Sequence, residues 1–201
     1  MRKGRVTIFD YGAGNLHSLG KAVALGGISP VIETDPLRAI ETDVLLLPGV
    51  GAFTPATEAL APGRDAMREA LENGLPCLGI CLGMQLLFES SDEGPGDGLG
   101  LIPGHVERII AARLPQIGWN SLDDASDPLL QTAALREAYY ANSFVCRPRD
   151  ASVVTAFSTH EGDRYPAAVR SGRTVGVQFH PEKSSSSGVD FVRAFLAEAL
   201  A

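Results

Sequence analysis

The sequence lacks the features that would place the protein at a membrane or on a nucleic acid. No apolar run approaches the roughly 18 to 20 residues that a membrane-spanning helix needs. The basic start, Met-Arg-Lys-Gly-Arg, precedes a stretch that is too short and too polar for a secretion signal. There is no block of lysine and arginine, and the net charge is −7, whereas neutralising phosphates requires clustered cations. We therefore expect a cytoplasmic protein with no membrane and no nucleic-acid partner.

Cysteine and histidine are scarce and scattered. The three cysteines, at positions 77, 81 and 146, form neither a disulfide framework nor a CxxC pair. The four histidines form no HxxxH motif and no mixed His/Cys cluster, which argues against a structural zinc ion. The sequence thus predicts no metal and no cofactor, and any functional cysteine should act through its thiol.

Short apolar runs alternate with helical patterns in the first half of the chain. Residues 5–9, 43–49 and 74–80 have the composition of buried parallel strands. Residues 15–25 and 64–74 have the apolar spacing of helices. This alternation predicts βαβ crossovers and a doubly wound sheet with helices on both faces.

The pattern changes after Glu89, where residues 90–104 read as a loop. Four segments follow in which polar and apolar residues alternate, at residues 105–112, 138–146, 151–157 and 173–179. They are expected to be mainly antiparallel strands that complete the sheet. An amphipathic helix is predicted over residues 188–200. The prediction is one α/β domain over residues 1–201, with a mixed, mostly parallel central sheet and an added antiparallel portion.

The strongest local pattern is Gly79-Ile80-Cys81-Leu82-Gly83, between an apolar strand and a helical segment. It has the G-x-nucleophile-x-G form of a nucleophile elbow, in which glycines prevent collisions with the neighbouring strand or helix. A helix start after Cys81 would favour its thiolate, and the N–H of Leu82 would point at an oxyanion. The alternative is a small buried apolar residue, which is the interpretation we favour for Cys77 and Cys146.

A base for such a thiolate is available at His180. Pro181 restricts His180 to extended backbone, and in an extended chain Glu182 faces the same way as His180. A carboxylate at one ring nitrogen would orient the imidazole and leave the other nitrogen for the thiol. The alternative is a histidine at a strand end beside a solvated glutamate.

Further on, Ser187 stands three residues before Asp190, a capping-box spacing that predicts a turn leading into the last helix rather than a linker.

Together the elbow and the His-Pro-Glu segment resemble the class I (triad) glutamine amidotransferases, over essentially the whole chain. Six segments carry the resemblance: DYGAGNLHSL (10–19), LLLPGVGAF (45–53), GICLGMQLLFESSDEG (79–94), GLGLIPG (98–104), PQIGWNSL (115–122) and FHPEKSS (179–185). The lysine after His-Pro-Glu and the Gly-Trp-Asn are similar to those glutaminase subunits that supply a (βα)8 cyclase of histidine biosynthesis. The resemblance implies the flavodoxin-like fold of this family.

The resemblance also implies roles for individual residues. Cys81, His180 and Glu182 would form a catalytic triad that hydrolyses L-glutamine to glutamate and ammonia through a thioester. The oxyanion would lie near Gly49, Val50, Gly51 and Leu82, where a peptide flip would couple activity to the partner. Glutamine would contact Gln85, Glu93, Ser143 and Phe144. The cyclase subunit, in a heterodimer, would contact Tyr11, Asn15, Trp119 and Lys183. The rival interpretation of residues 11–15, a dinucleotide-binding loop, fails because the third glycine is His17.

Several positions depart from the family pattern. Relatives often have His where this chain has Asn142, Tyr for Phe144, His-Met for Gln116-Ile117, and Gln for Ser185. We therefore expect only backbone contacts at position 144. Three other functions stay open: a triad subunit of another synthase, a Cys-dependent peptidase or γ-glutamyl hydrolase, and a non-catalytic partner-binding subunit.

Overall fold

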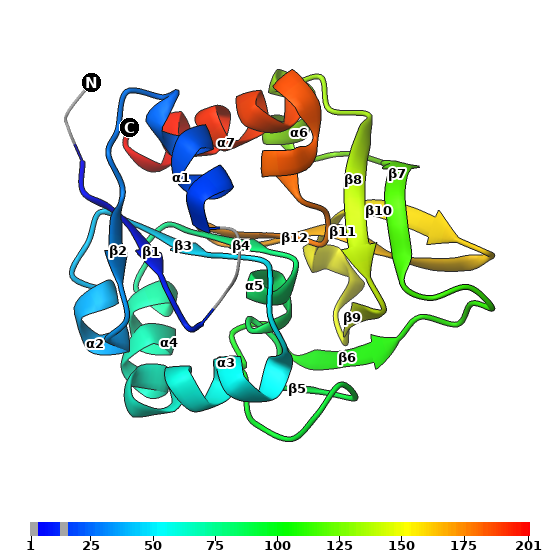
Figure 1. The fold of residues 1–201 in the computed structure, drawn as a ribbon, viewed down its shortest axis with the longest axis horizontal. Coiled ribbons are helices and arrows are strands. Elements are labelled where there is room, and N and C mark those ends of the chain that lie inside the picture. Colours follow the sequence, from blue (N-terminus) through cyan, green and yellow to red (C-terminus); the bar gives the residue numbers. More distant parts are fainter. Residues whose placement is uncertain (1–3, 13–15) are drawn as a thin grey trace.

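The computed structural model describes residues 4–12 and 16–201, and its centre is a seven-stranded sheet with the order β10-β11-β12-β4-β3-β1-β2 (Figure 1). Its strands are β1 (Val6–Phe9), β2 (Val31–Glu33), β3 (Val44–Leu47), β4 (Cys77–Ile80), β10 (Val154–His160), β11 (Asp163–Ser171) and β12 (Thr174–Val177). The five strands from β2 to β12 pair in parallel, and β11 and β10 extend the sheet antiparallel. The predicted mixed, mostly parallel sheet is confirmed.

Helices cover both faces of this sheet, as the alternating pattern predicts. Figure 1 shows α1 (Leu16–Ala24), α6 (Pro128–Thr132) and α7 (Ser185–Ala199) on one face. The other face carries α2 (Pro36–Ala39), α3 (Phe53–Leu60), α4 (Arg64–Glu72) and α5 (Leu82–Gln85). Every residue of β1, β3, β4 and β12 is consequently buried, which explains their continuous apolar runs. Along the described part of the chain, no helix is both long and apolar enough to cross a membrane.

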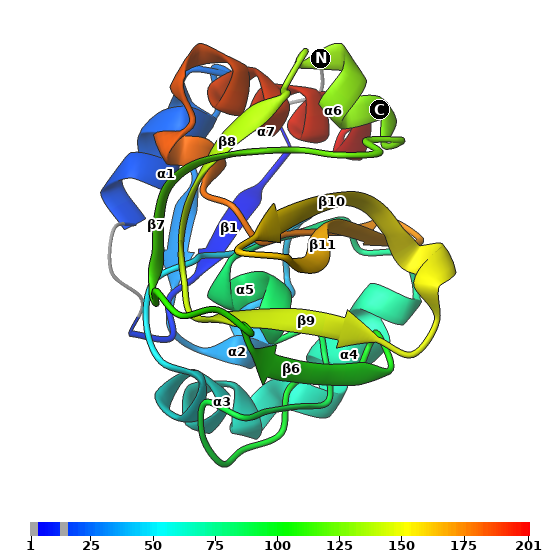
Figure 2. The ribbon, with the colours of Figure 1, turned by 90° about the vertical axis from the view of Figure 1, so that its right-hand side faces the viewer.

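Two smaller sheets lie beside the main one, which corrects the expectation that the later segments all complete it. One contains β5 (Ser90–Ser91), β6 (Gly104–Arg108) and β9 (Phe144–Pro148), and the other pairs β7 (Gln116–Ser121) with β8 (Glu137–Asn142). Figure 2 shows β6 and β9 crossing below β10 and β11, with β7 and β8 along the side. The predicted strand over 138–146 is divided at Ser143, where the chain passes from one small sheet to the other.

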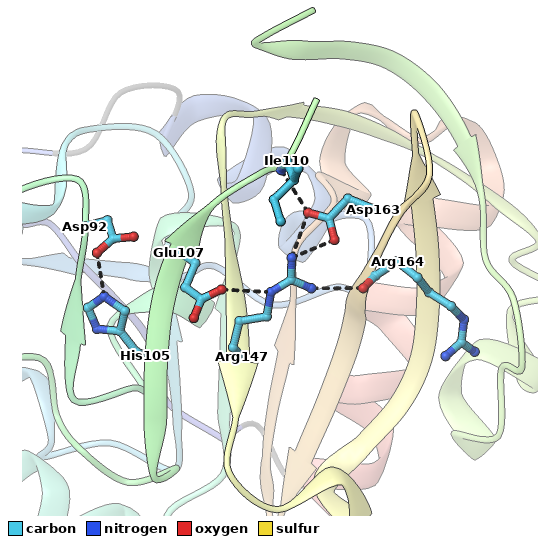
Figure 3. A network of polar contacts seen from close by, with 7 residues as sticks. All are labelled: Asp92, His105, Glu107, Ile110, Arg147, Asp163 and Arg164. Carbon is cyan, nitrogen blue, oxygen red and sulfur yellow. Dashed lines mark hydrogen bonds and ion pairs between the residues drawn. The ribbon is translucent and has the colours of Figure 1, made fainter. Parts of the chain in front are cut away.

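Arg147 of β9 joins the small sheet to the main one (Figure 3). Its Nη2 atom lies 2.7 Å from both carboxylate oxygens of Asp163, at the start of β11. Its Nη1 atom donates to the carbonyl of Arg164, and its Nε atom lies 3.4 Å from Glu107 of β6. Asp163 also accepts the backbone N–H of Ile110. One guanidinium thus fixes β6, β9 and β11 relative to one another. Because β9 begins at Phe144, the position of Phe144 depends on the same contacts.

The last helix begins at Ser185, so the predicted capping box at Ser187 is wrong. The residue at the N-cap is Ser184, whose hydroxyl donates to the His180 carbonyl at 2.7 Å and accepts the Tyr139 N–H at 2.9 Å. Asp190 pairs with Arg193 instead. A 3₁₀ turn, η3 (Pro181–Lys183), connects His180 to the helix, with two further 3₁₀ turns at η1 (Ala61–Gly63) and η2 (Ala151–Val153). The serines are a helix start, as expected, but the N-cap and the first helical residue each lie three residues earlier than predicted.

Candidate active site

Cys81 lies on a strained turn between β4 and α5. Its φ is 48°, in the left-handed region that residues other than glycine rarely adopt, and this confirms the sharp turn expected of an elbow. A Cβ atom on Gly83 would lie 2.1 Å from the carbonyl oxygen of Leu47 in β3, and one on Gly79 would lie 2.6 Å from that of Gly83. Both glycines are therefore required by close backbone packing, as the motif predicts.

His180 reaches the same sheet edge because β12 pairs in parallel with β4. Val177 is the register partner of Ile80, so Cys81 and His180 both follow the carboxyl ends of neighbouring strands. The backbone of His180 is extended, with φ −101° and ψ 94°, as expected before proline. Its Nδ1 atom lies 2.8 Å from Oε1 of Glu182, and the two side chains are 2% and 5% exposed. A solvated glutamate is thereby excluded, because the carboxylate is buried against the imidazole.

The electrostatics of this group favour a charged imidazole. Burial acts to lower the pKa of His180, because it disfavours the cation. The hydrogen bonds and negative charges of Cys81 and Glu182 act in the other direction and prevail, so the pKa is raised from 6.5 to about 10. Cys77 and Cys146 differ: both are fully buried, and burial raises the pKa of each thiol above its usual value. The buried apolar interpretation of these two cysteines is therefore confirmed.

A cavity of about 300 Å³ opens at Cys81 and His180. Nine other lining residues were predicted from the sequence as site or interface residues: Gly49, Val50, Gly51, Leu82, Gln85, Glu93, Ser143, Phe144 and Lys183. Three lining residues were not predicted: Pro115, Ala141 and Asn142. The division between β8 and β9 presents Ser143 and Phe144 to the cavity. A concave space with convergent polar groups beside a buried thiol suits a small polar substrate.

The polar side chains predicted to bind glutamine have defined partners. The Nε2 atom of Gln85 donates to the carbonyl of Phe144 at 3.2 Å, a backbone contact of the kind expected at position 144. The Oε2 atom of Glu93 accepts the N–H of Phe53, the first residue of α3, at 3.0 Å. The Nδ2 atom of Asn142 also donates to the Phe144 carbonyl. The walls of the cavity are thus fixed by hydrogen bonds between its own lining residues and the helix next to it.

The four residues predicted to contact a partner have different environments. Trp119 is 53% exposed and packs edge-to-face on Tyr139. The Nζ atom of Lys183 lies 5.8 Å from the centre of the Tyr139 ring, so a lysine and a tryptophan flank one tyrosine beside the cavity. Asn15 lies outside the described residues. The prediction for Tyr11 is corrected below.

Tyr11 does not offer its side chain to a partner. It is only 5% exposed, because its ring packs edge-to-face on Phe9 and its hydroxyl donates to the carbonyl of Pro48. Pro48 immediately precedes the Gly49–Gly51 turn. Tyr11 is therefore a support of the predicted oxyanion segment.

Sequence reasoning missed Gln178. This side chain is fully buried, and its Nε2 atom donates to the Sγ atom of Cys81 at 3.5 Å. The available signal was its position two residues before His180 in an extended run, which places both side chains on one face. The contact itself depends on β12 lying next to β4.

The fold and this site define a class of protein. The chain belongs to the class-I glutamine amidotransferase family, which matches residues 7–199. It is 38% identical over 201 residues to the imidazole glycerol phosphate synthase subunit HisH of Microcystis aeruginosa, covering 96% of this chain and 95% of that protein. It is 41% identical to the HisH subunit of Chlorobaculum tepidum, covering 94% and 98%. Within the family, the resemblance to these glutaminase subunits is confirmed.

Other similar proteins extend the comparison. The chain is 43% identical to the chloroplastic imidazole glycerol phosphate synthase hisHF of Arabidopsis thaliana over 95% of its own length, but it spans 34% of that protein. Among solved structures, a glutamine amidotransferase superposes with a TM-score of 0.77 at 21% identity, covering 98% of this chain and 100% of that one. The PurLQS structure from Thermotoga maritima gives 0.71 at 21% identity, covering 98% and 99%. These structures show the fold.

Proposed function

We propose that this chain is the glutaminase subunit of an imidazole glycerol phosphate synthase. It hydrolyses L-glutamine and passes the ammonia to a (βα)8 cyclase subunit, HisF, which makes imidazole glycerol phosphate and AICAR in histidine biosynthesis. The observation that carries the proposal is that Cys81 and His180, the latter paired with the buried Glu182, line one cavity of about 300 Å³. The relatives named HisH, and the one named hisHF, support the choice of synthase and of partner.

The first half of the reaction forms the thioester. The Cys81 thiolate attacks the side-chain amide carbon of glutamine, and the new S–C bond places negative charge on the amide oxygen. The N–H of Leu82 and the turn at Gly49–Gly51 would receive that oxygen, a role supported by their place in the lining of the cavity. The imidazolium of His180 gives its Nε2 proton to the nitrogen, the C–N bond breaks, and ammonia leaves.

The second half restores the enzyme. The neutral imidazole of His180 takes a proton from water, and the hydroxide attacks the thioester carbon. The S–C bond breaks, glutamate leaves, and the thiolate–imidazolium pair forms again. Glu182 accepts from Nδ1 throughout, which fixes the tautomer and stabilises the imidazolium. Gln85, Glu93 and the backbone at residues 143–144 would hold the amino-acid end of glutamine.

The partner would cover the exposed surface beside the cavity. Ile117 and Trp119 on β7 are 66% and 53% exposed, and the Tyr139 ring that Trp119 contacts also lies near Lys183. A cyclase subunit seated here would close the mouth of the cavity against water. Ammonia would then leave toward the partner and would not be protonated in solvent.

The decisive experiment measures glutamine hydrolysis with and without the cyclase subunit carrying its nucleotide ligand. We expect weak hydrolysis alone, strong hydrolysis in the complex, and transfer of ammonia to the cyclase product. Strong hydrolysis that the partner leaves unchanged would overturn the gated-subunit proposal. Hydrolysis of γ-glutamyl peptides without any partner would favour a hydrolase, and failure of ammonia transfer would favour another synthase.

Cys81→Ala should abolish glutamine-dependent synthesis while the complex still forms and still uses added ammonium salt. Cys77→Ala is the matched control, because it removes the same sulfur atom from a buried cysteine in β4. This variant should retain glutamine-dependent activity. Full glutamine-dependent activity in Cys81→Ala would refute the assignment of the nucleophile.

The docking surface can be tested separately. Trp119→Ala should weaken binding of the cyclase subunit by about tenfold or more, since exposed aromatic residues dominate many interfaces. Leu25→Ala, at a residue 67% exposed just after α1, is the control and should leave binding unchanged. Equal affinities for both variants and the unchanged protein would remove Trp119 from the interface.

A further inference from the structure

The side-chain amide of Gln178 links Cys81 to Gln85, and both of these residues line the cavity. Its Nε2 atom is 3.5 Å from the Sγ atom of Cys81, and its Oε1 atom is 3.5 Å from the Nε2 atom of Gln85. Gln178 follows β12 and is fully buried, with its backbone N–H donated to the carbonyl of Ala167. Hydrogen bonds therefore run from a residue that lines the cavity to the reactive sulfur.

The direction of this chain of hydrogen bonds is set by the donors of Gln85. A side-chain amide has two N–H groups, and Gln85 directs its Nε2 atom to the Phe144 carbonyl and to Gln178. Because Gln85 donates to Gln178, the atom of Gln178 that faces Gln85 must be its oxygen, Oε1. The NH₂ group of Gln178 therefore faces Cys81. The sulfur consequently receives an N–H, and a donor stabilises a thiolate more than a thiol.

We propose that Gln178 is a positioning residue for the amidotransferase reaction, oriented by Gln85, that donates a hydrogen bond to the Cys81 thiolate and holds the sulfur for attack. This inference rests on the proposed function. His180 neutralises the thiolate from one side, and Gln178 supplies a second, uncharged donor that takes no part in proton transfer. This hydrogen bond weakens once the thioester forms, because a thioester sulfur carries no charge and is a weak acceptor.

The test measures the pH dependence of Cys81 alkylation by iodoacetamide, located by mass spectrometry to separate Cys81 from Cys77 and Cys146. Gln178→Met keeps the length of the side chain and removes the donor. We expect the alkylation midpoint to move up by about one pH unit, as loss of a hydrogen bond to a charged group requires. In the complex, kcat should fall about tenfold or more and KM should change less.

Two further variants separate positioning from folding. Gln178→Asn keeps the amide but is one methylene too short to span from Gln85 to Cys81, and it should reproduce the shift in midpoint. Ser158→Ala removes a buried hydroxyl that bonds to Tyr140 and to the Ser121 carbonyl, and it should lower stability without moving the midpoint. An unchanged midpoint in folded Gln178→Met or Gln178→Asn protein would overturn the inference.

The alkylation assay needs neither glutamine nor the partner, so the two proposals fail in different ways. If Cys81→Ala retains glutamine-dependent synthesis, the proposed function is wrong. If Cys81→Ala is inactive and the midpoint is the same in Gln178→Met and in the unchanged protein, only the role of Gln178 is wrong.

Discussion

The Nδ1 atom of His180 and the Oε1 atom of Glu182 are 2.8 Å apart, in side chains that are almost completely buried. The other oxygen of Glu182, Oε2, is buried and has no hydrogen-bond partner within residues 4–12 and 16–201. The carboxylate thus interacts with the imidazole alone. A buried carboxylate with a single partner is costly to maintain unless that partner is charged, which agrees with the raised pKa of His180.

Glu182→Gln tests this pair. The amide keeps the shape of the side chain but loses the negative charge that stabilises the imidazolium, so kcat of the glutamine-dependent reaction should fall about a hundredfold. The rate with added ammonium salt should stay the same and serves as the control for folding and docking. An unchanged kcat would show that Glu182 has no part in orienting or charging His180.

The pH dependence of stability tests the protonation of His180. Its pKa is raised from 6.5 in the unfolded chain to about 10 in the folded protein. A raised folded-state pKa stabilises the protein fully below pH 6.5, and this contribution is lost as the pH rises toward 10. The difference in free energy of unfolding between the protein and His180→Gln should therefore shrink over that range, as measured by urea denaturation. A difference that is constant with pH would contradict the charged imidazole.

The elements of the site that are local in sequence could be predicted. The elbow at Cys81 follows from glycine spacing around a strand end, and the pairing of His180 with Glu182 follows from the intervening proline. These patterns depend on sterics within a few residues. Cys81 and His180 then meet because each follows the carboxyl end of a parallel strand, and these ends lie at the same edge of the sheet.

Features that depend on distant packing could not be predicted. The alternating pattern of residues 138–146 indicates strand but does not say which sheet the strand joins or that Ser143 divides it. The burial of Tyr11 depends on the Pro48 carbonyl, 37 residues away. The same holds for Gln178, whose contact with Cys81 spans 97 residues. Hydrophobic periodicity predicts which face of a strand or helix a side chain lies on. Which distant residues the side chain then contacts is known only from the fold.

Arg147 provides a test of how the small sheet is held. Arg147→Met keeps much of the side-chain volume but leaves the 8%-exposed carboxylate of Asp163 without the Nη2 donor that contacts both of its oxygens. The free energy of unfolding should fall by about 2 kcal/mol. Arg113→Met, which removes an 88%-exposed guanidinium from Glu161, is the matched control and should have a smaller effect, because solvent screens exposed pairs. If urea denaturation gave the same loss of unfolding free energy for both variants, Arg147 would not hold the small sheet to the main one.

Gly83→Ala should damage the fold at the elbow, since the added Cβ atom would lie 2.1 Å from the backbone oxygen of Leu47. Neither group can rotate away, so β3 and α5 must move apart, and the free energy of unfolding should fall by about 3 kcal/mol. Gly20→Ala is the control: its nearest neighbour would be a carbon of Pro30 at 4.0 Å, within helix α1. There alanine should stabilise by about 0.5–1 kcal/mol. Thermal and urea unfolding of the two variants should therefore shift in opposite directions, and a stable Gly83→Ala protein would mean that the elbow tolerates a wider separation of strand and helix.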